Sequence, residues 1–209
     1  TYSTEEGDFH AENIRIGGGE IVFDYVSPLG NIQDVQLGVP VAINIENGIA
    51  AMALAQISGV TNEEIKAGMA SFRGVDRRFD FKIKTDKIVY LSDYAHHPEE
   101  IKQSILSMRA LYADKKLTAI FQPHLYTRTR DFYQEFAESL SLLDEVIITE
   151  IYPARELPIE GVSSQLIYDH LRPGIEKTLC KKEDILELLK NKDIEVLMTL
   201  GAGDVENYV

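Results

Sequence analysis

Apolar positions over the last two-thirds of the chain alternate between short continuous runs and longer helical stretches. Short apolar runs bounded by turns are typical of buried strands, and they lie at residues 117–121, 146–149 and 196–200. Residues 81–84 and 88–91 flank a Thr-Asp-Lys turn and predict a hairpin. Helical spacing, such as that of Ile101, Ile105 and Met108, predicts helices over 98–112, 131–142, 163–171 and 183–190.

The first 75 residues have a weaker pattern. Residues 1–40 look irregular and rich in glycine, with one alternating run over 21–26 that predicts a strand. Helices are expected over 47–57 and from Thr61 to about Phe72, where Thr61 and the following acidic residues form a start signal.

Strands that alternate with helices predict parallel β-α units, so the fold class is α/β. We expect residues 76–209 to form one domain with a mostly parallel sheet and flanking helices. Residues 1–75 are interpreted as the end of a preceding domain, because they are too few and too irregular to suggest an independent core. The boundary is placed near Gly74 to Asp76.

Composition excludes several classes of protein. Apolar residues make up 44% of the chain, which excludes a wholly disordered protein. The net charge of −13 argues against a general nucleic-acid binder or a binder of anionic membranes, because both need a basic surface. A local site for a phosphorylated ligand remains compatible with this charge, since nearby arginines decide anion binding.

The single cysteine, Cys180, forbids an internal disulfide and a cysteine-based zinc finger, and it fits a reducing cytoplasm. We find no apolar stretch of membrane-spanning length and no signal peptide. The chain begins without Met and in mid-pattern, so we expect a fragment of a longer polypeptide.

Unusual residues follow three of the predicted strands. They form the loops 93–99, 122–130 and 201–204, and the first two hold three of the five histidines. In open α/β sheets, ligands bind outside the carboxyl ends of the strands. The sequence therefore predicts a site at this edge, whereas the isolated His10 and His170 are expected to be structural or exposed.

The loop 93–99 allows three interpretations. Pro98 suits the first position of a helix, so the loop would lie beside a helix N-terminus, which favours anions. Alternatively, His97 only caps that helix and Asp93 only ends a strand. A zinc site from Asp93, His96, His97 and His124 is disfavoured, because neighbouring residues of an extended segment point to opposite faces.

The loop 122–130 places Arg128 and Arg130 where a helix is expected to begin. Cations are unfavourable in the first turn of a helix, so these arginines suggest an anionic partner rather than a merely exposed helix start. The pair Arg77 and Arg78 is less specific, and the Gly-Ala-Gly-Asp turn at 201–204 could serve packing or phosphate binding. No G-x-x-x-x-G-K-[ST] phosphate loop occurs in the chain.

Taken together, these segments resemble the Mur ligase family, the ATP-dependent amide-forming enzymes of bacterial peptidoglycan synthesis. The resemblance covers nearly the whole chain in a consistent order. It rests on the segments 44–51 (NIENGIAA), 72–79 (FRGVDRRF), 93–98 (DYAHHP), 121–129 (FQPHLYTRT), 156–161 (ELPIEG) and 201–203 (GAG).

The resemblance implies a three-domain enzyme, of which this chain would hold the end of the central ATP-binding domain and most of a dinucleotide-fold-like C-terminal domain. The implied reaction joins L-alanine to the carboxylate of UDP-N-acetylmuramate through an acyl phosphate, with ATP and Mg²⁺. The metal ligands would lie mainly in the missing part of the central domain, so this chain alone would be inactive. Nucleic acid and membrane are not expected partners, and no oligomeric state is implied.

The same resemblance implies roles for individual residues. Asn44 and Asn47 would hold the adenine, Arg78 would contact the ATP phosphates, and Asp93 would bind the ribose or orient Arg78. The alanine pocket would consist of Tyr94, His96, His124 and Arg128, with Arg128 as the partner of the substrate carboxylate. Arg78, His96 and His124 are the implied catalytic residues.

Three positions depart from the family pattern: Ile43 stands where His is frequent, Ser92 where Asp is usual, and Leu125 where Arg is usual. Other interpretations also stay open. A sister ligase that attaches a recycled murein tripeptide shares the His-His-Pro loop but would not be expected to show the segment 122–129. A metal-dependent hydrolase could use Asp93, His96 and His124, and a non-catalytic binding module could have kept the fold.

Overall fold

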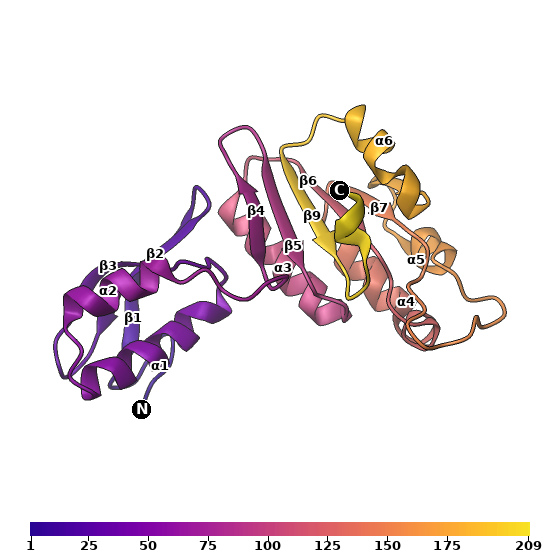
Figure 1. Ribbon diagram of the computed structural model, residues 1–209. Helices are drawn as coiled ribbons and strands as arrows, with labels where there is room; N and C mark the ends of the chain where they lie inside the picture. The colour runs from indigo at the N-terminus through magenta and orange to yellow at the C-terminus, as the bar shows by residue number, and fades with distance from the viewer. The chain divides into compact units, whose positions relative to one another are not determined.

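The computed structural model describes residues 1–209, which divide into two compact units (Figure 1). The first unit holds residues 1–75 and 107–113, and the second holds 76–106 and 114–209. The division therefore passes through helix α3 (Pro98–Leu111).

The first unit contains a three-stranded antiparallel sheet in the order β1 (His10–Gly17), β2 (Glu20–Val26) and β3 (Ile32–Gln36). Alternate residues of β2, namely Ile21, Phe23 and Tyr25, are buried, as expected for a strand with one covered face. Helices α1 (Ile43–Ile57) and α2 (Asn62–Ser71) complete the unit. Thr61 and Glu64 form a reciprocal capping box at the start of α2, which confirms the predicted start signal.

The prediction of an irregular segment over residues 1–40 was wrong, because two of the three strands were missed. Six of the eight residues of β1 are exposed, so that strand has no buried face that a pattern of apolar residues could mark. Helix α1 also begins at Ile43, four residues before the expected start at Asn47.

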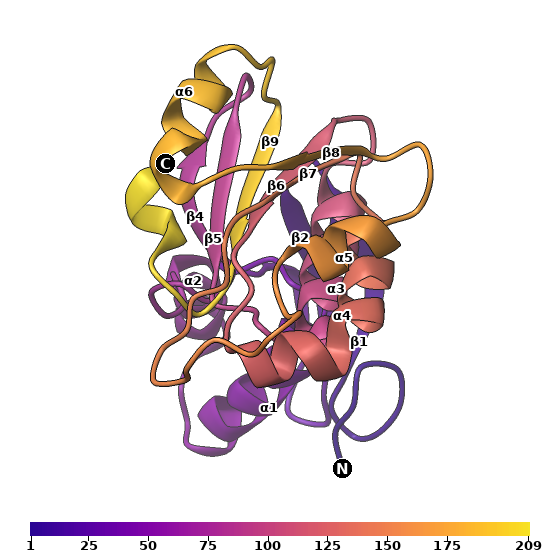
Figure 2. The same ribbon diagram turned by 90° about the vertical axis from the view of Figure 1, so that its right-hand side faces the viewer.

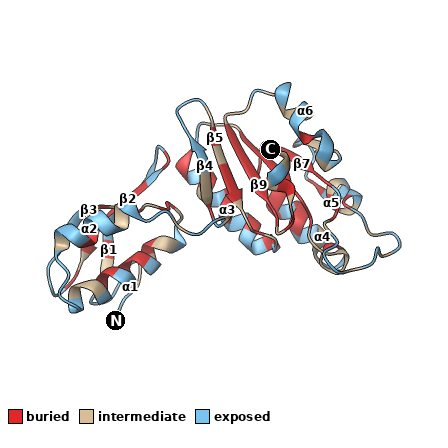
Figure 3. Cartoon of the chain, in the orientation of Figure 1, coloured by how far each residue is buried: buried red, intermediate tan, exposed pale blue.

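The second unit has a six-stranded sheet in the order β4-β5-β9-β6-β7-β8. Strand β4 (Asp80–Lys84) is antiparallel to β5 (Val89–Asp93), which confirms the hairpin, and the remaining pairs are parallel. Strands β6 (Leu117–Phe121), β7 (Glu145–Ile148) and β9 (Val196–Leu200) are buried throughout, as Figure 3 shows for β7 and β9. This mostly parallel sheet confirms the predicted α/β fold class. Strand β8 (Glu176–Leu179) was not predicted, because it lies at the sheet edge and is only partly buried.

Helices cover both faces of this sheet (Figure 2). Helices α3, α4 (Tyr126–Leu140) and α5 (Gln165–His170) lie on one side, where Phe121 of β6 packs against Phe136 of α4. On the other face, α6 (Ile185–Lys190) and the short 3₁₀ helix η2 (Val205–Tyr208) pack over Ile120 and Ile147. A second 3₁₀ helix, η1 (Lys182–Asp184), precedes α6. No helix of the chain combines the length and the apolarity that a membrane crossing requires.

The strand order brings the predicted loops together. Strand β9 lies between β5 and β6, and Leu200 at its end pairs with both Asp93 and Phe121. The loops after these strands therefore lie side by side at the carboxyl edge of the sheet. Helix α4 begins at Tyr126 rather than at the expected Asp131, and the non-helical Phe132, one residue after the expected start, marks a kink in this helix.

Candidate functional site

Four loops form the carboxyl edge of the sheet. Three of them were predicted from the sequence, and the fourth is the loop that follows β7. Tyr152 of this fourth loop donates its backbone N–H to the Pro123 carbonyl at 2.8 Å, and Leu125 donates its N–H to the Tyr152 carbonyl at 3.0 Å. The loops after β6 and β7 are therefore joined backbone to backbone.

Four aromatic rings form a continuous chain across these loops. The ring centroids of Tyr94 and His96 are 5.3 Å apart, those of His96 and His124 are 6.0 Å apart, and those of His124 and Tyr152 are 5.6 Å apart. The structure thus brings the predicted Tyr94, His96 and His124 together. Tyr152 had no signal in the sequence, because it lies in a loop without a motif.

The two histidines in the chain of rings differ in their hydrogen bonds. His96 Nδ1 lies 2.8 Å from the Tyr94 carbonyl oxygen, which can only accept, so Nδ1 carries the proton and Nε2 is left for a ligand. His124 Nδ1 is buried without a hydrogen-bond partner. Burial, and then the positive charge of Arg128, hold the pKa of His124 below its ordinary value.

Arg128 lies in the first turn of α4 and is half-buried. It donates one long hydrogen bond, 3.5 Å from Nη1 to the His96 carbonyl oxygen, so most of its fork of donors remains for an anion. Arg130 differs, because it is exposed and forms an ion pair with Asp131 at 2.7 Å. Of the two arginines predicted to mark an anion site, only Arg128 faces the histidines.

Asp93, at the end of β5, holds the neighbouring turn in place. Its carboxylate accepts hydrogen bonds from the Ser104 hydroxyl and from the backbone N–H groups of Phe79 and Ala95. Burial raises the pKa of Asp93 even though these hydrogen bonds act in the opposite direction. Through Phe79, Asp93 fixes the backbone directly after Arg78, whose own side chain is exposed.

The paired arginines separate in the fold. Arg77 forms an ion pair with Glu206 at 2.8 Å, donates to the Gly203 carbonyl at 2.8 Å, and lies over the Tyr94 ring at 4.9 Å. Ser92, one of the three departures from the family pattern, donates to the same Glu206 carboxylate at 2.7 Å. Arg77 is therefore bound within the protein, which leaves Arg78 as the exposed cation of the pair.

The Gly-Ala-Gly-Asp turn after β9 is packed against Gln122. A Cβ at Gly203 would lie 2.0 Å from Gln122 Oε1 and 2.9 Å from the Tyr152 ring. The same Oε1 accepts the N–H groups of Asp204 and Val205 at 2.9 and 3.2 Å. Of the two interpretations of this turn, the structure supports close packing.

The loop 93–99 is closed by a carboxylate from helix α3. Glu100 accepts the backbone N–H groups of His96 and His97 at 2.9 and 3.1 Å, and the His97 carbonyl accepts the Ile101 N–H at 3.0 Å, so His97 lies at the N-cap position of the helix. No group of three His, Cys, Asp or Glu side chains in the chain could hold a metal ion. Asp93, His96 and His124 are thus not brought together as ligands of one ion.

The first unit contains a cavity of about 330 Å³ that includes both predicted adenine contacts. Asn44 is half-buried and donates to the Val39 carbonyl at 3.2 Å, and Asn47 donates to Asn44 Oδ1 at 3.2 Å. Ile43, another departure, begins the same helix and is exposed. Most of the lining is apolar or glycine: Leu37, Gly38, Val39, Asn44, Asn47, Gly48, Ala51, Gly68, Met69 and Phe72.

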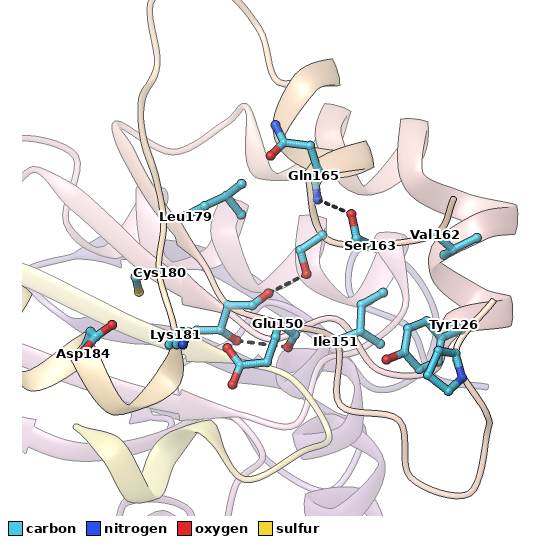
Figure 4. Close-up of a pocket in the computed structure, with 13 residues that line it drawn as sticks. Tyr126, Glu150, Ile151, Val162, Ser163, Gln165, Leu179, Cys180, Lys181 and Asp184 are labelled. Carbon is cyan, nitrogen blue, oxygen red and sulfur yellow. Dashed lines mark hydrogen bonds between the residues drawn. The ribbon is translucent and has the colours of Figure 1, made fainter. Parts of the chain in front are cut away.

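A hollow of about 640 Å³ lies beyond the ends of β7 and β8 (Figure 4). Tyr126 at the start of α4 and Ile151 belong to its wall, together with Cys180, Lys181 and Asp184. Figure 4 shows Ser163 accepting the Gln165 N–H, a hydrogen bond of 3.3 Å. Sequence patterns gave no signal for this hollow, because its wall comes from several separate segments.

Comparison with known proteins adds three similarities. The family described as "Mur ligase, glutamate ligase domain" matches residues 77–205. The UDP-N-acetylmuramate–L-alanine ligase of Phocaeicola vulgatus is 82% identical over the whole chain, and that of Parabacteroides distasonis is 59% identical. This chain covers 46% and 45% of those proteins, so it spans about half the length of the curated relatives it matches.

Among solved structures, the UDP-N-acetylmuramate-alanine ligase of Thermotoga maritima matches the whole chain with a TM-score of 0.81 and 26% identity. The chain covers 45% of that structure. The similarity in structure thus extends over both units of the chain.

Proposed function

The chain belongs to the Mur ligase family, and from that premise we propose that its full-length protein joins L-alanine to the carboxylate of UDP-N-acetylmuramate at the expense of ATP, through an acyl phosphate. The reaction is a step of peptidoglycan synthesis and would take place in the cytoplasm. The curated relatives that match the chain over its whole length have the name of this ligase.

The observation that carries the proposal is the meeting of Tyr94, His96, His124 and Arg128 at one edge of the sheet. An arginine with free donors suits the carboxylate of a small amino acid. The free Nε2 of His96 suits the amine, as a hydrogen-bond acceptor. These residues form the amino-acid site, which binds L-alanine next to the acyl group.

The histidines would act on the attacking amine. The ammonium group of alanine must lose a proton before its nitrogen can act as a nucleophile, and a neutral imidazole within reach can accept a hydrogen bond from the resulting amine. His124 is kept neutral near pH 7 because burial and the neighbouring Arg128 lower its pKa. His96 and His124 would therefore orient the amine and the tetrahedral intermediate that follows.

Contacts with ATP are assigned to Asn44, Asn47 and Arg78. The mostly apolar cavity with Asn44 and Asn47 fits a purine base, because the two amides offer donors and acceptors beside apolar walls. Asp93 holds the backbone directly after Arg78. Arg78 would contact the phosphates and stabilise the negative charge that develops during phosphoryl transfer. Residues 1–75 would then be the end of the central ATP-binding domain and residues 76–209 the C-terminal domain. Mg²⁺ would supply positive charge that neutralises the phosphates, and its ligands would come mainly from the rest of the central domain.

The decisive experiment measures phosphate release by the full-length protein with ATP, Mg²⁺ and UDP-N-acetylmuramate. We expect release that depends on added L-alanine. Release only with the murein tripeptide would assign the protein to the recycling reaction instead. No release with either amino donor would contradict the ligase function and favour a binding module or a hydrolase.

A further inference from the structure

The start of helix α4 has no capping residue of its own. Its N-cap position is Leu125, which has φ +74° and no side-chain oxygen, and no acidic residue lies in the first turn. The first turn instead contains Arg128, a cation at the positive end of the helix dipole. The sequence of α4 therefore does not explain how the free N–H groups of this turn are satisfied.

A carboxylate from the next loop caps the helix. Glu156, 29 residues further along the chain than Thr127, accepts the Thr127 N–H at 3.0 Å and the Thr127 hydroxyl at 2.5 Å. The Thr127 hydroxyl, the Thr127 N–H and the Tyr126 N–H all hold the pKa of Glu156 below its usual range. Glu156 is thus ionised near pH 7, and it supplies the negative charge that this helix terminus favours.

Thr127, to which Glu156 binds, lies in the sequence between the two residues that would contact the amino acid. Thr127 directly precedes Arg128, and His124 lies three residues earlier in the same loop. The loop that holds Glu156 is also bound to this segment through Tyr152, which stacks on the His124 ring with an angle of 14° between the planes. A change at Glu156 would therefore move the backbone that bears Arg128 and His124.

We propose that Glu156 is the positioning residue of the amino-acid site: it caps α4 from the loop after β7 and so fixes Arg128 and His124 for the substrate. This inference rests on the proposed function for the identity of the substrate. Glu156 itself acts through Thr127 and does not need to touch the amino acid.

The test uses the full-length enzyme with Glu156→Ala, Glu156→Gln and the matched control Glu160→Ala. Glu160 is an exposed carboxylate four residues further along the same loop. Glu156→Ala should raise KM for L-alanine by about tenfold, while KM for ATP changes by less than about twofold, because the cap lies at the amino-acid site alone. Glu156→Gln keeps one acceptor oxygen and should give an intermediate KM, and Glu160→Ala should behave like the wild type.

A second readout separates this proposal from the proposed function. Hydrogen–deuterium exchange of peptides spanning residues 122–132 should be faster in Glu156→Ala than in the wild type and in Glu160→Ala. Unchanged exchange, an unchanged KM for L-alanine, or an equal rise of KM for ATP would overturn the role of Glu156. If the wild-type enzyme does not depend on L-alanine, the proposed function fails, and the exchange rates alone decide whether Glu156 holds the helix start.

Discussion

Individual side chains at the edge of the sheet have charges and proton affinities that depend on their immediate neighbours. Arg77 and Arg78 are adjacent in sequence, yet Arg77 is bound to Glu206 and to backbone carbonyls while Arg78 is exposed. His124 has a buried nitrogen without a partner beside the cation Arg128. The chemistry of each residue is therefore decided by contacts within a few ångströms rather than by residue type.

Replacing Arg128 tests the carboxylate partner. In the full-length enzyme, Arg128→Ala should raise KM for L-alanine far more than KM for ATP, by about 10²-fold, since a charge-assisted bidentate contact is lost. Arg130→Ala is the matched control, because Arg130 is exposed and paired with Asp131. Equal effects of Arg128→Ala on both Michaelis constants would show that Arg128 does not bind the amino acid.

The protonation of His124 can be followed by NMR of histidine-labelled full-length protein. We expect His124 to titrate below 6.5, because burial and then the charge of Arg128 disfavour its charged form. The unfolded chain binds this proton more readily, so His124 stabilises the fold above about pH 6.5, and this contribution is lost as the pH falls through the lower folded pKa. Arg128→Ala should raise the pKa of His124, and a titration at or above 6.5 in the wild type would contradict this account.

At the scale of secondary-structure elements, the loop that follows β9 depends on contacts with the end of β6 and with the loop after β7. Gly201 has φ +142°, and a Cβ there would lie 2.7 Å from the Gln122 carbonyl oxygen. Gly203 allows the Gln122 side chain to reach the backbone of residues 204 and 205. These glycines are needed for close approach of two segments that are about eighty residues apart in the chain.

A side chain at Gly203 should separate the loop from the sheet. Gly203→Ala is expected to lower the free energy of unfolding by about 1–3 kcal/mol, because the new Cβ would overlap Gln122 Oε1. Thermal unfolding measures this as a fall of several degrees in Tm. Gly68→Ala, in a helix position with open space, should leave Tm unchanged or higher. Equal midpoints for the two variants would mean that the turn does not need glycine.

For the molecule as a whole, the adenine contacts are expected in the first unit, and the phosphate and amino-acid contacts are expected in the second. The cavity with Asn44 and Asn47 lies in the first unit, and the amino-acid site lies in the second. Neither unit contains a phosphate loop, since no such motif occurs in the 209 residues. The proposed reaction therefore needs residues outside this chain.

A polypeptide of residues 1–209 should consequently show no Mg²⁺-dependent ATP hydrolysis, with or without L-alanine. The measurement is phosphate release under the conditions used for the full-length protein, which acts as the positive control. Turnover by the 209 residues alone would contradict the view that the phosphate-binding residues lie elsewhere.

The pattern of residues by itself determined the elements with a clear local signal. Continuous apolar runs identified β6, β7 and β9, and helical spacing identified α3. These elements could be predicted because a buried strand or a buried helix face requires apolar residues at regularly spaced positions close together in the chain. The motif loops also pointed to Tyr94, His96, His124 and Arg128. Strands β1, β3 and β8 were missed. The mostly exposed β1 and the partly buried β8 have no such signal.

Only the tertiary structure decided which distant segments meet. The position of β9 between β5 and β6, the stacking of Tyr152 on His124, and the cap that Glu156 places on α4 all join residues 28 or more positions apart. Sequence periodicity reports only on neighbours within a few residues, whereas these contacts depend on strand order and on packing between loops. The sequence therefore identified the chemical groups of the candidate site, and the fold determined their partners.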